Sequence, residues 1–192
     1  NKLNVDYIFI PKINDIYTLK RKRKIKLNKA DIVLCAKHRK GHFEGVLDVM
    51  DRLTKLISPN RIYMGEKDLQ QYHLVKKFLR SKYKTKVIKC ETVRSANKVA
   101  LSSRNSLLNS KNILTASKIT KEIIKLKKII PKKYKINQYL HHKRKDLIKK
   151  YKIKIEYLEN RNTQNFKKSN TFKNSKVFVA YYLNKVRLID NL

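Results

Sequence analysis

Four consecutive residues, Gly65, Glu66, Lys67 and Asp68, place two carboxylates and one compact cation between an apolar stretch and a helical pattern. The apolar residues 62–64 predict the end of a buried strand, and Asp68 is well placed to cap the helix that follows. Gly65 permits a tight turn and close approach to the backbone. At the carboxyl end of a parallel strand, backbone N–H groups and a helix N-terminus favour anions, so this stretch predicts a site for an anionic ligand.

Taken alone, this turn is typical of an ordinary charged link between a strand and a helix. Three further blocks change that interpretation. Residues 34–46 contain Arg-Lys-Gly-His-Phe, residues 93–105 contain Leu-Ser-Ser-Arg, and residues 185–191 are Lys-Val-Arg-Leu-Ile-Asp-Asn. In this order and spacing, the blocks resemble the pantothenate synthetase (pantoate-beta-alanine ligase) family, adenylate-forming enzymes of the nucleotidyltransferase-like Rossmann group. The resemblance covers nearly the whole chain.

The resemblance implies an ATP-dependent ligase that condenses pantoate with beta-alanine. The reaction would pass through a pantoyl adenylate with release of pyrophosphate and AMP, and Mg²⁺ would assist. The family pattern places Gln71 on pantoate and makes Lys67 and Arg104 the catalytic cations, with no residue assigned as a metal ligand. The residues that it places on ATP are Gly65, Glu66, Lys67, Asp68, Val93, Leu101, Ser102, Ser103 and Arg104.

These residue types suit the charge requirements of such a reaction. A carboxylate is a poor electrophile, so it must be converted to an acyl adenylate before an amine can attack. Cations and oriented donors then have to neutralise the phosphates and the charge that develops at phosphorus. Lys67 is a compact positive charge on a flexible stem, and Arg104 offers a forked set of donors. Ser102 and Ser103 can donate hydroxyl hydrogen bonds to the triphosphate.

The patterning predicts an α/β fold, the C-terminal part of a Rossmann-like, nucleotidyltransferase-type parallel sheet followed by a small α+β domain. We expect residues 1–93 to be the remainder of the ATP- and pantoate-binding domain, and residues 94–192 to be a small C-terminal lid. In the first region we predict strands at 5–10, 32–36, 62–64 and 85–93, helices over 43–57 and from 69 to about 82, and a permitted short strand at 25–27 within a basic run over 18–29.

In the second region, apolar residues at steps of three and four predict a long helix ending near residue 130, before Pro131, and a helix over 136–151. Residues 154–158 and 176–183 predict strands, separated by a polar loop over 160–176. His141 and His142 fall in the second helix beside two basic residues, which is typical of a solvated helix face.

The composition indicates a folded protein without a membrane-spanning segment. Hydrophobic residues make up 41% of the 192-residue chain, which is enough for a folded core. No apolar run is long enough for a membrane span and no signal peptide is evident, so we expect a cytoplasmic protein. Cys35 and Cys90 lie in separate apolar stretches without metal-ligand spacing, and we interpret both as buried free thiols.

The net charge of +35, from 49 Lys plus Arg against 14 Asp plus Glu, would ordinarily indicate a nucleic-acid partner. A basic nucleic-acid-binding module on a Rossmann-like remnant is therefore the alternative function. However, the lysines are spread over the whole chain and do not alternate with stacking aromatics as in an RNA-binding motif. We expect only non-specific, salt-sensitive binding to polyanions, and a homodimer by analogy with the family.

The sequence also departs from the family pattern. Asn97-Lys98 stands where the family usually has Asp-Gly, and Lys40 stands where it has Pro. The family's opening strand and its His-x-Gly-His motif, which meets the triphosphate, have no counterpart in these residues, so we expect this chain alone to be inactive. Two roles stay open: His42 is either a structural histidine that holds its loop or a general base, and Arg39 is a candidate anion contact.

Overall fold

The structure of the protein, a computed structural model, describes residues 4–17, 25–129 and 135–192. The first part of the predicted basic run, residues 18–24, and the predicted helix end at residue 130 lie outside the described residues. None of the helices in the described residues combines the length and apolar character needed to span a membrane.

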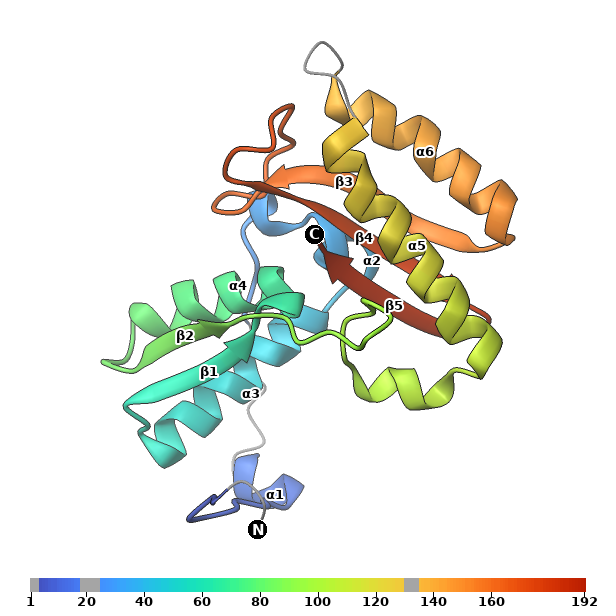
Figure 1. The fold of residues 1–192 in the computed structure, drawn as a ribbon. Helices are drawn as coiled ribbons and strands as arrows, with labels where there is room; N and C mark the ends of the chain where they lie inside the picture. Colours follow the sequence, from blue (N-terminus) through green and yellow to red (C-terminus); the bar gives the residue numbers. More distant parts are fainter. Residues whose placement is uncertain (1–3, 18–24, 130–134) are drawn as a thin grey trace.

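The first part of the chain places two long helices beside a two-stranded parallel sheet (Figure 1). Its elements are α1 (Ile13–Ile16), the 3-10 turn η1 (Lys29–Asp31), α2 (Leu34–His38), α3 (His42–Ile57), β1 (Arg61–Gly65), the 3-10 turn η2 (Glu66–Asp68), α4 (Leu69–Arg80) and β2 (Lys86–Cys90). β1 and β2 pair in parallel from Arg61 opposite Lys86 to Gly65 opposite Cys90, with α4 between them in sequence. The predicted strand, helix and parallel strand are therefore confirmed, but the second strand spans 86–90 and not 85–93.

The second part of the chain is built on a three-stranded antiparallel sheet in which β4 is the middle strand. Its elements are the 3-10 turn η3 (Ser103–Leu107), α5 (Ser110–Ile129), α6 (Ile136–Tyr151), β3 (Lys154–Asn162), β4 (Ser175–Leu183) and β5 (Val186–Asn191). The predicted fold class, a parallel sheet followed by a smaller α+β part, is confirmed. The domain boundary at residue 93 stays a prediction.

The middle strand β4 separates two hydrophobic cores. Side chains alternate between the two faces of a strand, so one strand can serve both. One face joins the core that contains α5 and α6, through Val177, Val179, Tyr181 and Leu183. The other face joins the core formed with α2, α3 and α4, through Phe178 and Ala180. The antiparallel sheet is therefore covered on both sides, and its second face ties it to the first part of the chain.

A break in the ladder between β3 and β4 changes which face Tyr157 uses. The register shifts between Ile155 and Tyr157, as in a β-bulge. Ile155 and Leu158 belong to the core with α5 and α6, whereas Tyr157 belongs to the other core. The Tyr157 hydroxyl lies 3.1 Å from Cys35 Sγ in α2, so the bulge turns this side chain toward the first part of the chain.

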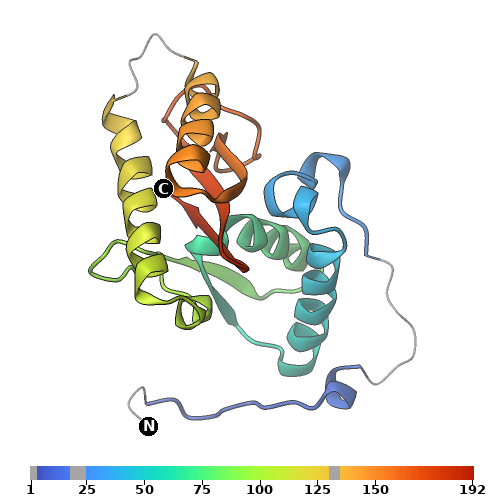
Figure 2. The same cartoon turned by 90° about the vertical axis from the view of Figure 1, so that its right-hand side faces the viewer.

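Two predicted strands are wrong. Residues 4–12 contain no helix or strand, and Tyr7, Ile8 and Ile10 are highly exposed, so the apolar segment 5–10 is not a central strand. Figure 2 shows this segment running along the lower edge, apart from both sheets. Residues 32–36 end in the short helix α2 rather than a strand, and its buried residues Leu34, Cys35 and Ala36 join the core from one helical turn. An apolar run this short does not distinguish helix from strand.

Two smaller predictions also fail. Residues 25–28 form no strand, although Ile25 and Leu27 are half-buried against the core. Cys35 is a buried free thiol as predicted, but Cys90 is free and exposed, because it is the last residue of β2 and its side chain lies outside the core. His141 and His142 are exposed, as predicted.

Candidate active site

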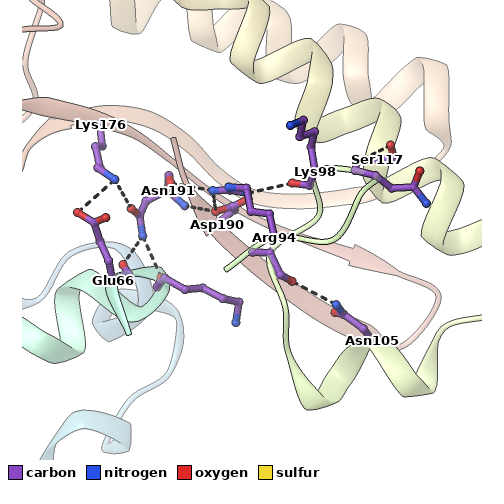
Figure 3. A network of polar contacts seen from close by, with 11 residues as sticks. Glu66, Arg94, Lys98, Asn105, Ser117, Lys176, Asp190 and Asn191 are labelled. Atoms are coloured by element: carbon purple, nitrogen blue, oxygen red, sulfur yellow. Dashed lines mark hydrogen bonds and ion pairs between the residues drawn. The ribbon is translucent and has the colours of Figure 1, made fainter. Parts of the chain in front are cut away.

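The turn η2 is one of the places where the C-terminal sheet contacts the first part of the chain. Asn191, the last residue of β5, donates from Nδ2 to the backbone oxygens of Glu66, at 2.7 Å, and of Lys67, at 2.9 Å. Figure 3 shows these contacts together with the neighbouring ion pairs. Because η2 directly follows β1, the predicted anion-binding turn is held by the end of a strand more than a hundred residues away in sequence.

The Glu66 carboxylate is neutralised by two lysines. Lys89 Nζ lies 2.5 Å from Glu66 Oε1, and Lys176 Nζ lies 3.3 Å from the same oxygen. Burial alone would raise the pKa of Glu66, but the hydrogen bonds and charges of the two lysines lower it below its ordinary value. The carboxylate of Glu66 and its backbone carbonyl, which accepts from Asn191, are therefore both engaged within the protein.

Three other predicted residues have side chains available. Lys67, Asp68 and Gln71 form no side-chain hydrogen bond or ion pair with any other described residue. Asp68 stands directly before α4 as predicted, but its side chain accepts no capping hydrogen bond, so the capping interaction is wrong. Polar groups in a recess that the fold leaves unpaired are well suited to a ligand.

The expectation that Gly65 makes a tight turn is also wrong. Its φ is −67°, which any residue can adopt. A Cβ atom built at Gly65 would meet nothing within 4 Å, so the protein itself does not require glycine here. The open space beside this backbone leaves the second predicted role, close approach of a ligand, as the remaining reason for glycine.

Arg39 and His42 face each other across the turn between α2 and α3. Arg39 Nη1 lies 2.7 Å from His42 Nε2. Because guanidinium groups only donate, His42 Nε2 accepts here, and the imidazole is neutral with its proton on Nδ1. Burial and then the charges of Arg39 and Arg187 lower the pKa of His42, which favours the same neutral form. This pairing supports the structural interpretation of His42, since Nε2 is already engaged.

The second predicted block is brought together by a hairpin. Arg94 and Ala100 form an antiparallel bridge, and the Leu101 amide donates to the Val93 carbonyl at 2.9 Å. Val93 and Leu101, eight positions apart in sequence, therefore lie side by side, and both side chains are exposed. This explains how two separate parts of the block can belong to one binding surface.

The Ser-Ser-Arg part of this block caps η3 and contacts β5. Ser102 Oγ accepts from the Arg104 amide at 3.2 Å, whereas Ser103 is exposed. Arg104 Nη1 donates to the Arg187 carbonyl at 3.1 Å. The charge of Arg104 also contributes to lowering the pKa of Arg39, after burial and Arg187. Three guanidinium groups, from the end of α2, from η3 and from β5, thus share one electropositive region.

A pocket collects part of the first block, whereas Gly65 and Glu66 lie outside its wall, as does the second block. Lys67, Asp68 and Gln71 line it with Arg39 and His42, whereas the predicted ATP residues 93 and 101–104 lie outside its wall. The full lining is Leu34, Cys35, Arg39, His42, Phe43, Lys67, Asp68, Leu69, Gln70, Gln71, Tyr157, Phe178, Ile189 and Asp190.

Sequence reasoning missed several residues that support this pocket. Gln70 is buried, accepts from the Cys35 amide at 3.1 Å, and donates to the Asp31 and Val33 carbonyls, so it fixes the entry to α2. Arg94 and Asp190 form a bidentate ion pair. Only the Leu-Ile-Asp-Asn block gave a signal for the second group, and the sequence assigned it no role.

Comparisons with known proteins agree with this arrangement. The family model described as "Pantoate-beta-alanine ligase" matches residues 1–192. The pantothenate synthetase of Flavobacterium psychrophilum is 32% identical over 190 residues, covering 96% of this chain and 67% of that protein. The pantothenate synthetase of Helicobacter acinonychis is 35% identical over 200 residues, covering all of this chain and 70% of that protein.

Solved structures give the same result. A pantothenate synthetase from Thermus thermophilus superposes with a TM-score of 0.88 at 25% identity, covering all of this chain and 70% of that one. The pantoate-beta-alanine ligase of Francisella tularensis, "Complexed with Beta-gamma ATP and Beta-alanine", has a TM-score of 0.80 at 33% identity and covers all of this chain and 66% of that one. This chain belongs to the pantoate-beta-alanine ligase family.

Proposed function

We propose that this chain supplies the ATP- and pantoate-binding surface for the ligation of pantoate to beta-alanine through a pantoyl adenylate, with release of pyrophosphate and AMP. The observation that carries the proposal is the pocket beside η2, where Lys67, Asp68 and Gln71 have no partner among the described residues and lie next to Arg39. An unpaired cation, carboxylate and amide at the carboxyl end of a parallel strand match a nucleotide and a polar acid.

The reaction requires that negative charge be neutralised on the pantoate carboxylate and on the phosphates of ATP. Pantoate is an anion, and its carboxylate oxygen must attack the α-phosphorus of ATP while pyrophosphate leaves. In our proposal Lys67 neutralises phosphate charge in the transition state, and Gln71 holds pantoate by its polar groups. Arg104 supplies a second cation from η3. Its guanidinium still has donors available after the one bond to the Arg187 carbonyl.

The hairpin that begins at Arg94 is the second half of the proposed ATP site. In this proposal Val93 and Leu101 lie against the nucleotide, Ser102 and Ser103 donate to the triphosphate, and Gly65, Glu66 and Asp68 complete the opposite wall. With ATP held between η2 and this hairpin, the hairpin would exclude water from the reactive anhydride.

Magnesium would accompany ATP and would neutralise part of the charge on its phosphates. Among the residues that the structure describes, no group of three or more His, Cys, Asp or Glu side chains could hold a metal ion. The Asp68 carboxylate is unpaired and beside Lys67, and one carboxylate plus phosphates and waters is a usual donor set for Mg²⁺. The residues present therefore fit an ion that arrives with the nucleotide, and Asp68 is the residue that would hold it.

We further propose a cytoplasmic homodimer, and we propose that these 192 residues bind ATP without completing adenylation, because the family's His-x-Gly-His has no counterpart in them. The alternative, a basic module that binds nucleic acid, is favoured only by the net charge of +35. Such charge gives salt-dependent binding to any polyanion and carries no sequence preference.

The test is calorimetric titration of the chain with a non-hydrolysable ATP analogue and Mg²⁺, with and without pantoate. We expect Lys67→Ala to weaken ATP binding about tenfold or more, as for loss of a charge-assisted phosphate contact. Lys86→Ala is the matched control, since Lys86 is exposed at the opposite end of the same parallel sheet. Equal affinity in the two variants would remove Lys67 from the site.

Two added assays separate the enzyme from the alternative. Pyrophosphate release should be absent with ATP and pantoate if the chain alone is incomplete. RNA titrations over a salt series should show affinity that falls steeply with salt and is equal for unrelated sequences. Sequence-selective RNA binding by a chain that does not respond to ATP would overturn the proposed function.

A further inference from the structure

Asp190 and Asn191, at the end of β5, are polar residues placed almost entirely out of water. Asp190 is 7% exposed and Asn191 is 2% exposed. Burying such groups is costly unless they are hydrogen-bonded, so their partners show what they hold in place. The partners described below are polar groups of the η2 turn, the hairpin and β4.

Asn191 closes a ring of polar contacts around η2 (Figure 3). Its Nδ2 donates to the Glu66 and Lys67 carbonyls, at 2.7 and 2.9 Å. Its Oδ1 accepts from Lys176 Nζ at 3.1 Å, and the same Nζ lies 3.3 Å from Glu66 Oε1. The turn is therefore held through its backbone and through a side chain at once, while the Lys67 ammonium is left without a partner among the described residues.

Asp190 holds the hairpin in the same way. Its carboxylate accepts a bidentate pair from Arg94, with distances of 2.7 and 2.9 Å. Arg94 Nη1 also donates to the Lys98 carbonyl at 3.1 Å, across the hairpin loop. The hydrogen bond to Asp190 raises the pKa of Arg94 above its ordinary value, against the effect of burial. Asp190 Oδ1 also accepts from the backbone N–H of Asn191 at 2.8 Å. This hydrogen bond links the contacts around η2 to the contacts with the hairpin.

We propose that Asp190 and Asn191 are positioning residues of the ATP site, and that they fix the η2 turn and the 93–105 hairpin relative to each other. The inference rests on the proposed function and deepens it. Two consecutive residues of one strand end hold the two segments that carry all the predicted ATP contacts. A small displacement of either segment would separate Lys67 from Arg104, and misplacements of this kind are costly in an active site.

The chain offers a matched control in Asn160 of β3. Asn160 is also fully buried, and its Nδ2 donates to two carbonyls, those of Ser169 and Thr171, both at 2.9 Å. Its Oδ1 accepts from Ser175 Oγ at 3.2 Å. The chemistry matches that of Asn191, but the segment it holds is the 163–174 loop, which carries no predicted site residue.

The experiment compares Asn191→Asp with Asn160→Asp in the 192-residue chain. Each change removes the amide donor at nearly constant size, so both should lower the melting temperature. We expect Asn191→Asp to weaken binding of the ATP analogue about tenfold or more, and Asn160→Asp to leave it within about twofold. Equal effects of the two variants on ATP affinity would show a general structural role and overturn the proposal.

Hydrogen exchange provides a second readout that does not depend on ATP. Asn191→Asp should speed amide exchange in residues 65–69 and 93–105, whereas Asn160→Asp should speed it in residues 163–174. If the wild-type chain binds no ATP, the proposed function fails, and the exchange pattern alone then decides the positioning role. Exchange that rises uniformly, or not at all in residues 65–69, would refute it.

A milder variant guards against loss of the fold. Lys176→Met removes the cation that bridges Asn191 Oδ1 and Glu66 but keeps a long apolar side chain on β4. We expect the same pattern with smaller amplitude, because Lys89 still neutralises Glu66. Asp190→Asn tests the contact between Asp190 and the hairpin. In this variant, amide exchange should rise more in residues 93–105 than in residues 65–69.

Discussion

The two sheets of this protein differ in how far they are covered. The middle strand of the antiparallel sheet, β4, has seven of its nine residues buried, because helices or loops pack on both of its faces. In the parallel sheet, β1 has no buried residue and β2 has one, Val87. Tyr63, in the middle of β1, is 61% exposed. The antiparallel sheet is therefore part of the hydrophobic core, whereas the parallel sheet is largely exposed to solvent.

The candidate site lies on the less buried sheet and is fixed by the better buried one. The predicted turn η2 begins where β1 ends, yet its carbonyls are held by Asn191 from β5. A short, half-exposed sheet has little packing of its own to fix a turn precisely. This difference suggests that precision at the site comes from the C-terminal sheet, whereas the first part of the chain supplies the chemical groups.

The largest expected effect tests this difference in stability. Leu147 of α6 is fully buried in the core that α5 and α6 form with one face of β4. Leu147→Ala should therefore cost about 2–5 kcal/mol of unfolding free energy, from lost transfer energy and a residual cavity. Tyr63→Ala in β1 should cost about 1 kcal/mol or less, since this side chain is mostly exposed. Urea denaturation measures both, and similar losses would contradict the comparison.

A smaller effect concerns two carboxylates, each held by two lysines. In the second part of the chain, Glu122 of α5 accepts from Lys143 and Lys150 of α6, both at 2.7 Å, and from the Tyr151 hydroxyl at 2.6 Å. Burial alone would raise the pKa of Glu122, but these hydrogen bonds lower it to about 2. Glu66 has the corresponding arrangement at the site, with two lysines from two sheets.

Because the folded pKa of Glu122 lies below its ordinary value of 4.5, its contribution to stability is complete above that value. The contribution is lost as the pH falls from about 4.5 through about 2. We expect Glu122→Gln to cost about 1 kcal/mol at neutral pH, allowing for solvent screening, and to approach wild type in acid. Urea titrations at several pH values measure the difference, and a gap that persists unchanged near pH 2 would contradict this assignment.

The sequence predicted the elements whose signals are local. The helical period over 43–57 and 136–151 gave α3 and α6 within a residue or two, because an amphipathic face is visible in one stretch of chain. The segment 5–10 has the composition of a strand, but a strand also needs a partner, and pairing is not a local property. β5 was missed as a strand for a related reason, since only its motif was visible.

The site shows the same limit. Lys67, Asp68 and Gln71 were predicted from one continuous block, and the fold places them in one pocket. Asp190 and Asn191 act on residues about a hundred positions earlier, so no spacing rule connects them. Their burial and hydrogen bonds depend on how the fold brings β5 next to η2 and the hairpin, which the sequence does not specify locally.

The smallest expected effect concerns Lys98, in the hairpin that joins the two parts of the chain. The Lys98 amide donates to the Ser95 carbonyl at 2.8 Å, and Lys98 has a φ of +66°. A turn followed by one left-handed residue is a usual three-residue hairpin loop, and glycine is preferred at that last position. Lys98 therefore holds a left-handed conformation that disfavours its own Cβ atom.

Lys98→Gly should therefore stabilise the chain. Relief of the left-handed conformation is worth about 1–2 kcal/mol, and the extra freedom of glycine in the unfolded chain offsets about 0.5–1 kcal/mol, leaving a net gain of about 0.5 kcal/mol. The Arg94 contact to the Lys98 carbonyl uses the backbone and should survive. Lys145→Gly, at an exposed position inside α6, should have the opposite sign and cost about 1 kcal/mol. Thermal melts of the two variants decide the matter, and a loss of stability in Lys98→Gly would mean that the lysine side chain, rather than the hairpin backbone, stabilises this joint.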